Sequence, residues 1–209
     1  MTDFDYSPMF PQAADDTAYE LVSTEHVEMV ELGGEEFLKV DPEALRLLAQ
    51  RAFADISHLL RSSHLAQLRA ILDDPEATQN DRFVALEMLK NAVVAADGLL
   101  PMCQDTGTAI ISGTRGDRVL VTGDDGEALS RGVYDTYQES NLRYSQLAAT
   151  SMFDEVNTAT NLPAQIDLYA GKGTEYKFAF IQKGGGSANK TFLHQKTKAV
   201  LNPGGLRDF

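Results

Sequence analysis

The chain changes character along Leu100-Pro101-Met102-Cys103-Gln104-Asp105-Thr106-Gly107-Thr108-Ala109-Ile110-Ile111. Before this stretch, apolar residues recur at the spacing of helices, whereas after it short runs of β-branched and aromatic residues are separated by turn residues. Because helices come first and strands follow, we expect an α+β fold in which helices pack on a mixed or antiparallel sheet.

The helical part covers residues 42–97. Asp41-Pro42-Glu43 is typical of a helix start, with aspartate at the N-cap and proline at the first helical position. Apolar spacing continues from there to Leu60, a short helix follows Ser62-Ser63, and a third helix is expected over about residues 80–97.

The first 40 residues predict an arm with short strands. Residues 1–16 mix prolines with acids, which is typical of extended chain. Alternating runs at 18–22, 26–32 and 35–40 indicate strands, and the second and third predict a hairpin around Gly33-Gly34. We therefore divide the chain into an arm, residues 1–40, and a catalytic domain, residues 41–209.

The second half of the chain predicts a sheet. Strands are expected at 108–113, 118–122, 165–170 and 176–181, the first two joined by a Gly116-Asp117 turn. Helices are expected from Glu127 to Gln146 and from Lys190 to Val200. Residues 203–209 are typical of a helix opening, so we expect the chain to be the truncated front portion of a longer protein.

Charge and cysteine content exclude several classes of function. The 209 residues carry a net charge of −13, which disfavours nucleic acid and anionic membranes as partners. One cysteine forms no internal disulfide, and neither a targeting segment nor a membrane span is evident, so we expect a cytoplasmic protein. Residues 1–60 carry a net charge of −10 and residues 151–209 one of +2, so a small anion should bind in the last third.

The first candidate site is Cys103-Gln104-Asp105-Thr106, which combines a thiol, a carboxamide, a carboxylate and a hydroxyl. One interpretation is a buried structural cysteine beside a turn. The other is a metal ligand whose companions lie elsewhere, because a nucleophilic cysteine would need a nearby base and the histidines are distant in sequence.

Two further segments suit an anion. The loop from Lys183 to Lys190 exposes backbone N–H groups of three glycines between lysines, which fits carboxylate or phosphate, although a plain turn explains it equally well. Arg143, expected at the C-terminal end of a helix, either forks onto a carboxylate or compensates the helix dipole. Together these residues suit a small polycarboxylate beside a metal centre.

Four segments, in order, resemble the class I, iron–sulfur-dependent fumarate hydratases. They are Pro101-Met102-Cys103-Gln104-Asp105-Thr106-Gly107-Thr108-Ala109, residues 141–146, residues 161–167 and residues 183–191. The likeness extends over essentially the whole chain, but over only the N-terminal portion of such a single-chain enzyme.

The resemblance implies a homodimeric hydro-lyase that interconverts (S)-malate with fumarate and water. Members of this family hold a 4Fe–4S cluster by three cysteines, and the open iron acts as a Lewis acid. The resemblance makes Cys103 a cluster ligand and Asp105 a catalytic residue that exchanges a proton with water. It also implies that the dicarboxylate is bound by Gln104, Asp105, Arg143, Gly186, Asn189, Lys190, Thr191, His194 and Gln195.

The chain departs from the family in having one cysteine where three are needed. We therefore expect that these 209 residues alone neither hold the cluster nor turn over malate. L-tartrate dehydratase, or another hydro-lyase of a 2-hydroxydicarboxylate, is the alternative enzyme. A phosphate-binding or nucleotide-binding module built on the glycine loop and a non-catalytic interaction protein with an acidic head are the alternatives from other classes.

Overall fold

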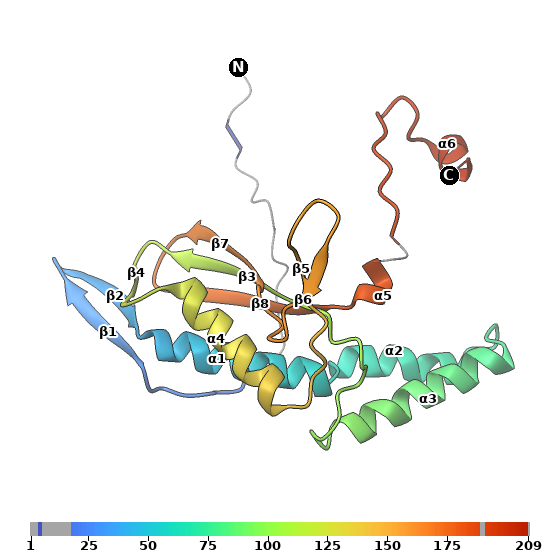
Figure 1. Ribbon diagram of the computed structural model, residues 1–209, viewed down its shortest axis with the longest axis horizontal. Coiled ribbons are helices and arrows are strands. Elements are labelled where there is room, and N and C mark those ends of the chain that lie inside the picture. Colours follow the sequence, from blue (N-terminus) through green and yellow to red (C-terminus); the bar gives the residue numbers. More distant parts are fainter. Residues whose placement is uncertain (1–3, 6–17, 189–190, 209) are drawn as a thin grey trace.

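The computed structural model describes residues 4–5, 18–188 and 191–208, and it confirms the α+β class (Figure 1). The helices are α1 Pro42–His58, α2 Ser62–Asp73, α3 Gln79–Ala95, α4 Asp125–Glu139, α5 Gly185–Ala188 and α6 Pro203–Arg207. The strands are β1 Val27–Leu32, β2 Glu35–Val40, β3 Thr108–Gly116, β4 Val119–Val121, β5 Leu147–Ala149, β6 Glu155–Asn157, β7 Gln165–Gly171 and β8 Tyr176–Lys183.

The predicted hairpin at the start of the chain is present and belongs to a small mixed sheet. β1 and β2 pair antiparallel around Gly33 and Gly34, whose φ angles of 64° and 85° suit glycine. β4 then pairs parallel to β2, with Leu38 opposite Val119. The segment predicted as an arm therefore shares a sheet with a strand from the second half of the chain.

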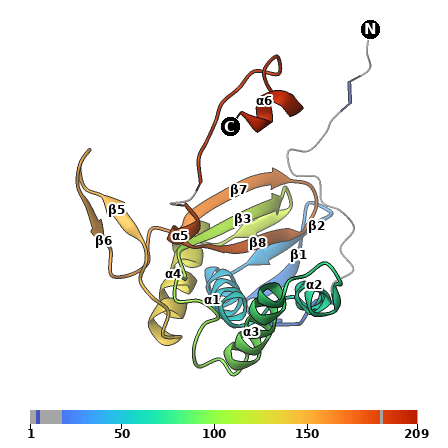
Figure 2. The same ribbon diagram turned by 90° about the vertical axis from the view of Figure 1, so that its right-hand side faces the viewer.

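The second sheet has the order β7-β3-β8 and carries the core on one face. β3 is its central strand, parallel to β7 and antiparallel to β8. The inward-facing Ala109 and Ile111 are fully buried, as is Phe53 of α1. In Figure 2, α1 and α4 lie together beneath this sheet, so the sheet is covered by helices on that side.

α1 and α4 pack closely because a glycine allows their approach and partly buried polar bonds join them. A Cβ atom on Gly132 would lie 2.3 Å from the Arg46 carbonyl oxygen, so only glycine permits this approach. The Arg46 guanidinium contacts the Asp135 carboxylate at 2.7 Å, and the Thr136 hydroxyl donates to the Gln50 carbonyl at 3.0 Å.

The N-terminal caps of α1 and α3 are formed by residue types that favour helix starts. The Asp41 side chain accepts the Glu43 N–H at the start of α1, with proline in the first turn. Thr78 and Asp81 form a capping box at the start of α3. α2 and α3 pack against each other and extend sideways beyond the sheets in Figure 1.

Two predicted helices differ from the structure, one in where it ends and one in whether it forms. α4 ends at Glu139 rather than Gln146, because Asn141 adopts a φ of 54°, which a right-handed helix cannot contain. The predicted helix over 190–200 does not form in the part that is described. Residues 191–197 have no regular structure and 198–200 form a turn, and all of these residues are exposed. An isolated helix of this length needs packing that these residues do not have.

Other differences concern short strands. Residues 18–22 are exposed and are not a strand, whereas β5 and β6 form a hairpin that the sequence did not indicate, because three-residue strands are too short to show alternation. Most of the predicted extended arm, residues 1–16, lies outside the described residues. Among the described residues, none of the helices combines the length and the apolar character that crossing a bilayer requires.

Candidate active site

The segments that carry Gln104, Asp105 and Gly186 meet at one end of the β7-β3-β8 sheet. Thr108, at the start of β3, is paired with Lys183, at the end of β8. Because β7 runs parallel to β3, the chain that enters β7 arrives at the same end. The loop before β3, the loop before β7 and the glycine turn after β8 are therefore neighbours, although they are up to 81 residues apart in sequence.

Asp105 lies at the centre of this end. Its carboxylate accepts the N–H of Gly185 at 3.1 Å and the N–H of Gly186 at 2.8 Å. These backbone donors, Gly186 first, lower the pKa of Asp105, and the positive charges of Arg143 and Lys183 lower it further. Asp105 is therefore ionised at neutral pH and acts as a hydrogen-bond acceptor.

Glycines allow the two loops to approach so closely. A Cβ atom on Gly107, whose φ is +61°, would lie 1.9 Å from the Lys183 carbonyl oxygen. A Cβ atom on Gly184 would lie 2.8 Å from an Asp105 carboxylate oxygen. The glycine turn is therefore an anion-binding loop, as its composition indicates, but two of its N–H groups bind a carboxylate of the protein itself.

Arg143 lies in a loop and not at a helix end, which corrects the position expected from the sequence. Its backbone carbonyl accepts the Thr106 hydroxyl at 2.8 Å, so the Arg143 segment is attached to the residue that follows Asp105. The side chain of Arg143 is exposed, and its charge acts on the Asp105 carboxyl. The helix-dipole role considered above is excluded, and a role in binding an anion stays a prediction.

Cys103 is exposed, so the interpretation as a buried structural cysteine is wrong. The peptide before it is held by two helices. The Met102 N–H donates to the Ser57 carbonyl at the end of α1, at 3.0 Å, and the Asn91 side chain of α3 donates to the Met102 carbonyl at 2.7 Å. The thiol is thus presented to solvent on a firmly anchored loop.

The donors of this chain do not make a complete iron–sulfur site. Within residues 4–5, 18–188 and 191–208, no three histidine, cysteine, aspartate or glutamate side chains are grouped so as to hold a metal ion. The sequence has a single cysteine. Cys103 fits the role of one thiolate ligand, and a cluster would need further thiolates from outside these 209 residues.

The remaining predicted residues are distributed unevenly. Gln104 is exposed beside Asp105, and Gly186 donates to Asp105. Thr191, His194 and Gln195 lie on exposed chain that leaves the sheet after α5 in both Figure 1 and Figure 2. Asn189 and Lys190 lie outside the described residues. The structure thus brings Gln104, Asp105, Arg143 and Gly186 together, and of the later residues that it describes, Thr191, His194 and Gln195 lie on the departing chain.

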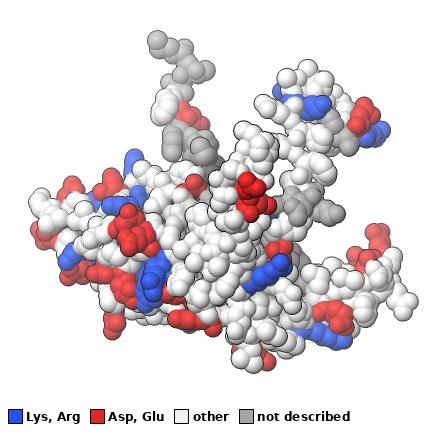
Figure 3. All heavy atoms as spheres, in the orientation of Figure 1, with Lys and Arg blue, Asp and Glu red and all other residues white. Residues whose placement is uncertain are grey.

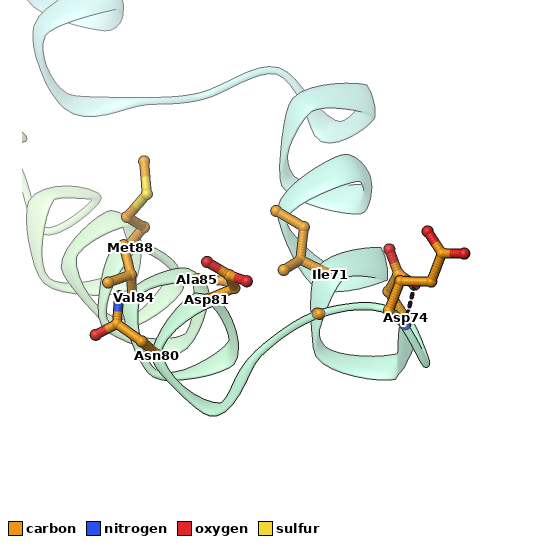
Figure 4. A pocket seen from close by; sticks show the side chains of 9 residues that line it. Ile71, Asp74, Asn80, Asp81, Val84, Ala85 and Met88 are labelled. Atoms are coloured by element: carbon orange, nitrogen blue, oxygen red, sulfur yellow. Dashed lines mark hydrogen bonds between the residues drawn. The ribbon is translucent and has the colours of Figure 1, made fainter.

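A groove of about 510 Å³ between α2 and α3 is a poor place for an anion (Figure 4). Its lining includes the carboxylates of Asp74, Glu76 and Asp81, and none of the predicted site residues. Acidic side chains also crowd the end of the molecule formed by β1 and β2 in Figure 3. Both regions repel a dianion.

Two buried residues that hold the loops at this end were not singled out by the sequence analysis. Asn161 is fully buried and its amide bonds to Gly107, Ser145 and Gln146. The Tyr137 hydroxyl donates to the Thr106 carbonyl at 2.9 Å, and burial raises the pKa of Tyr137 to about 12, so it stays a neutral donor. In the sequence, Tyr137 has no distinguishing feature beyond its place on the apolar face of α4. Asn161 is distinguished only by its place in residues 161–167, one of the four segments that carry the family resemblance.

Comparison with known proteins identifies the family to which most of the chain is similar. Residues 46–209 match the family model described as Fumarate hydratase (Fumerase). The chain is 59% identical over 206 residues to "Fumarate hydratase class I, anaerobic" of Escherichia coli K12, covering 99% of this chain and 38% of that protein. It is 58% identical over 212 residues to "Fumarate hydratase 1, mitochondrial" of Leishmania major, covering 100% of this chain and 39% of that protein.

The "Fumarate hydratase class I, aerobic" of Escherichia coli K12 is likewise 59% identical over 206 residues, which cover 99% of this chain and 38% of that relative. The chain therefore spans less than two fifths of the length of these curated relatives. The family match extends over most of the chain and includes every segment that meets at Asp105. The chain belongs to the class I fumarate hydratase family.

Proposed function

We propose that the protein is a hydro-lyase that interconverts fumarate and (S)-malate. The observation that carries the proposal is the convergence of the Cys103–Asp105 loop, the Arg143 loop and the glycine turn at one end of the sheet, joined by hydrogen bonds of 2.8 to 3.1 Å. The names of the similar proteins support the same activity.

The residues of this chain suit the handling of a dicarboxylate. The guanidinium of Arg143 offers two parallel donors to one substrate carboxylate, which is the strong form of such a contact. The Asp105 carboxylate, already held by two N–H groups, is oriented to accept a proton from water. Gln104 and Gly186 stand beside it, and residues 189–195 complete the proposed binding set.

The proposed cofactor is a 4Fe–4S cluster, with Cys103 as one ligand. Such a cluster supplies a Lewis acid that stabilises a leaving hydroxide. The exposed, anchored position of the thiol is compatible with this role, whereas the absence of a second cysteine from the sequence means that the other ligands come from outside these 209 residues. For this reason the 209 residues alone should neither bind the cluster nor turn over malate.

Assembly and location are parts of the same proposal. The homodimer rests on the family alone and the cytoplasmic location on the character of the sequence, whereas one similar protein is named as mitochondrial. The division into an arm of residues 1–40 and a catalytic domain of residues 41–209 also stays a proposal, which limited proteolysis of the chain would test.

The test is an anaerobic assay of the native enzyme with fumarate, (S)-malate and L-tartrate as separate substrates. Arg143→Lys keeps the charge but loses the fork, so we expect weaker binding of malate, measured as a KM raised about tenfold or more. Arg61→Lys, at an exposed arginine before α2, is the matched control and should leave KM unchanged. Turnover of tartrate without turnover of malate would reassign the substrate.

A second pair of variants separates the cofactor from the chemistry. Cys103→Ala should lose iron, sulfide and activity together, whereas Asp105→Asn should keep the iron content and lose rate. Asp97→Asn, at an exposed aspartate after α3, is the control for Asp105. Full activity of Asp105→Asn, or full iron content of Cys103→Ala, would contradict the roles proposed for these residues.

A further inference from the structure

The buried side chain of Asn161 joins two loops that the proposed function needs. Asn161 is 0% exposed and has a φ of 59°, so both its amide and its backbone conformation are unusual for a loop residue. It stands just before β7, at the same end of the sheet as Asp105.

Both halves of the Asn161 amide are used. Its Nδ2 donates to the Gly107 carbonyl at 2.9 Å. Its Oδ1 accepts the Ser145 N–H at 2.9 Å and the Gln146 N–H at 3.0 Å. One side chain therefore satisfies three backbone groups on two different segments, by donating once and accepting twice, which an ionised carboxylate or an aliphatic side chain cannot do.

These three contacts lie two or three residues from proposed substrate-binding residues. Gly107 is two residues after Asp105, and Ser145 is two residues after Arg143. The Thr106 hydroxyl also donates directly to the Arg143 carbonyl, so the Asp105 loop and the Arg143 loop are joined at a second place. The distance between the Asp105 loop and the Arg143 loop is thus set by these four hydrogen bonds, three of which Asn161 makes.

We propose that Asn161 is a positioning residue, which fixes the Arg143 segment relative to Asp105 and so sets the spacing at which a dicarboxylate is bound. The proposal rests on the proposed function for its substrate. Asn161 itself is buried and touches no substrate, so it acts only through the two loops.

The left-handed backbone favours asparagine over the longer amide glutamine at this position. Asparagine and glycine adopt positive φ with little strain. Asn161→Gly therefore keeps the backbone conformation and removes only the amide. Asn161→Asp keeps the acceptor for Ser145 and Gln146 and, when ionised, replaces the donor to Gly107 by a carboxylate oxygen that repels the Gly107 carbonyl oxygen.

The first measurement is amide hydrogen exchange, which does not depend on activity. In Asn161→Gly, exchange at Ser145 and Gln146 should be about tenfold faster or more, the loss expected for one or two hydrogen bonds. In Asn161→Asp it should stay as slow as in the parent. The control is Asn141→Gly, which makes the same change at an exposed asparagine with a φ of 54° and should leave these two amides unchanged.

The second measurement separates positioning from loss of folded protein in the anaerobically purified native enzyme. A less firmly held Arg143 binds the substrate and the transition state more weakly to the same degree. Asn161→Gly should therefore raise KM for malate about tenfold with kcat and iron content nearly unchanged. Partial unfolding would instead lower kcat and leave KM as it is.

The outcomes are distinct. Unchanged exchange at Ser145 and Gln146 in folded Asn161→Gly, or faster exchange with a KM within twofold of the parent, overturns the proposal. If Asn161→Gly does not fold, Asn161→Asp decides it at a pH where its carboxyl group is ionised: loss of the bond to Gly107 alone should also raise KM, and a KM within twofold of the parent overturns the proposal. If the parent enzyme turns over no dicarboxylate, the proposed function is wrong, and the exchange comparison alone still decides whether Asn161 holds the two loops.

Discussion

Gly107→Ala should separate the two loops of the candidate active site. The new Cβ atom would lie 1.9 Å from the Lys183 carbonyl oxygen, 2.3 Å from its carbon and 2.7 Å from the Gly184 Cα, whereas ordinary contact begins at 3.4 Å. All three neighbours are backbone atoms, so no side chain can rotate away. The loops must move apart by more than 1 Å, on the order of the bond lengthening that breaks a hydrogen bond.

The cost can be worked out from its parts. Alanine at a φ of +61° costs about 1–2 kcal/mol. Each bond lost between Asp105 and Gly185 or Gly186 adds about 0.5–1.5 kcal/mol. If both bonds are lost, we therefore expect a loss of about 2–5 kcal/mol in the free energy of unfolding, and a Tm lower by roughly 4–20 °C for a chain of this size.

The control for Gly107→Ala is Gly98→Ala. Gly98 has a φ of +74° with nothing within 4 Å of the new Cβ atom, so it carries the backbone penalty without the collision. Urea unfolding followed by circular dichroism measures both variants, and amide exchange at Gly185 and Gly186 reports the loop separation. Equal stabilities of the two variants, with unchanged exchange at these amides, would refute the reasoning.

Three further variants test the fold and the frame around the site. Gly132→Ala should destabilise by about 1–3 kcal/mol in urea unfolding despite the better helix propensity of alanine, because its Cβ atom meets the backbone of α1 at 2.3 Å; a gain in stability would contradict the close packing. Tyr137→Phe leaves the buried Thr106 carbonyl without its donor and should cost about 1–3 kcal/mol; an unchanged urea midpoint would show that this bond contributes nothing. The Thr78 hydroxyl, and then its backbone N–H, hold the pKa of Asp81 below its usual range. The stability that the ionised Asp81 contributes is therefore complete above the unfolded pKa of about 4 and is lost as pH falls through the lower folded pKa. Asp81→Asn should therefore be less stable than the parent at pH 7 and should approach it in strong acid, and a constant difference over that range of pH would contradict this.

The parts of the fold that could be predicted are those that depend on local chemistry. Asp41 with Pro42 defines the start of α1, and Gly33-Gly34 defines the hairpin, because caps and tight turns need particular residues within a few positions. The end of α4 could not be predicted, since Asn141 is compatible with helix and with left-handed turn alike. The pairing of β4 with β2 also has no local signal.

The candidate site divides in the same way. Cys103, Asp105 and the glycine turn stand out in the sequence, because chemically reactive or conformationally special residues gather within a few positions. Their arrangement was not predictable, since the donation of Gly185 and Gly186 to Asp105 depends on the antiparallel pairing of β3 with β8. Asn161 and Tyr137 were missed because a buried polar residue acquires its meaning only from the backbone groups around it.

The parallel pairing of β2 with β4 has a consequence for synthesis of the chain. Leu38 and its partner Val119 are about 80 residues apart, so a ribosome that adds 5–20 residues per second needs roughly 4–16 s between them. During that interval the outer edge of β2 has no strand beside it. The glutamates at 28, 31, 35 and 36 place charge along the nascent hairpin, and like charges of this kind discourage two emerging chains from joining edge to edge. The acidity of this end of the molecule therefore protects the hairpin before its permanent partner exists.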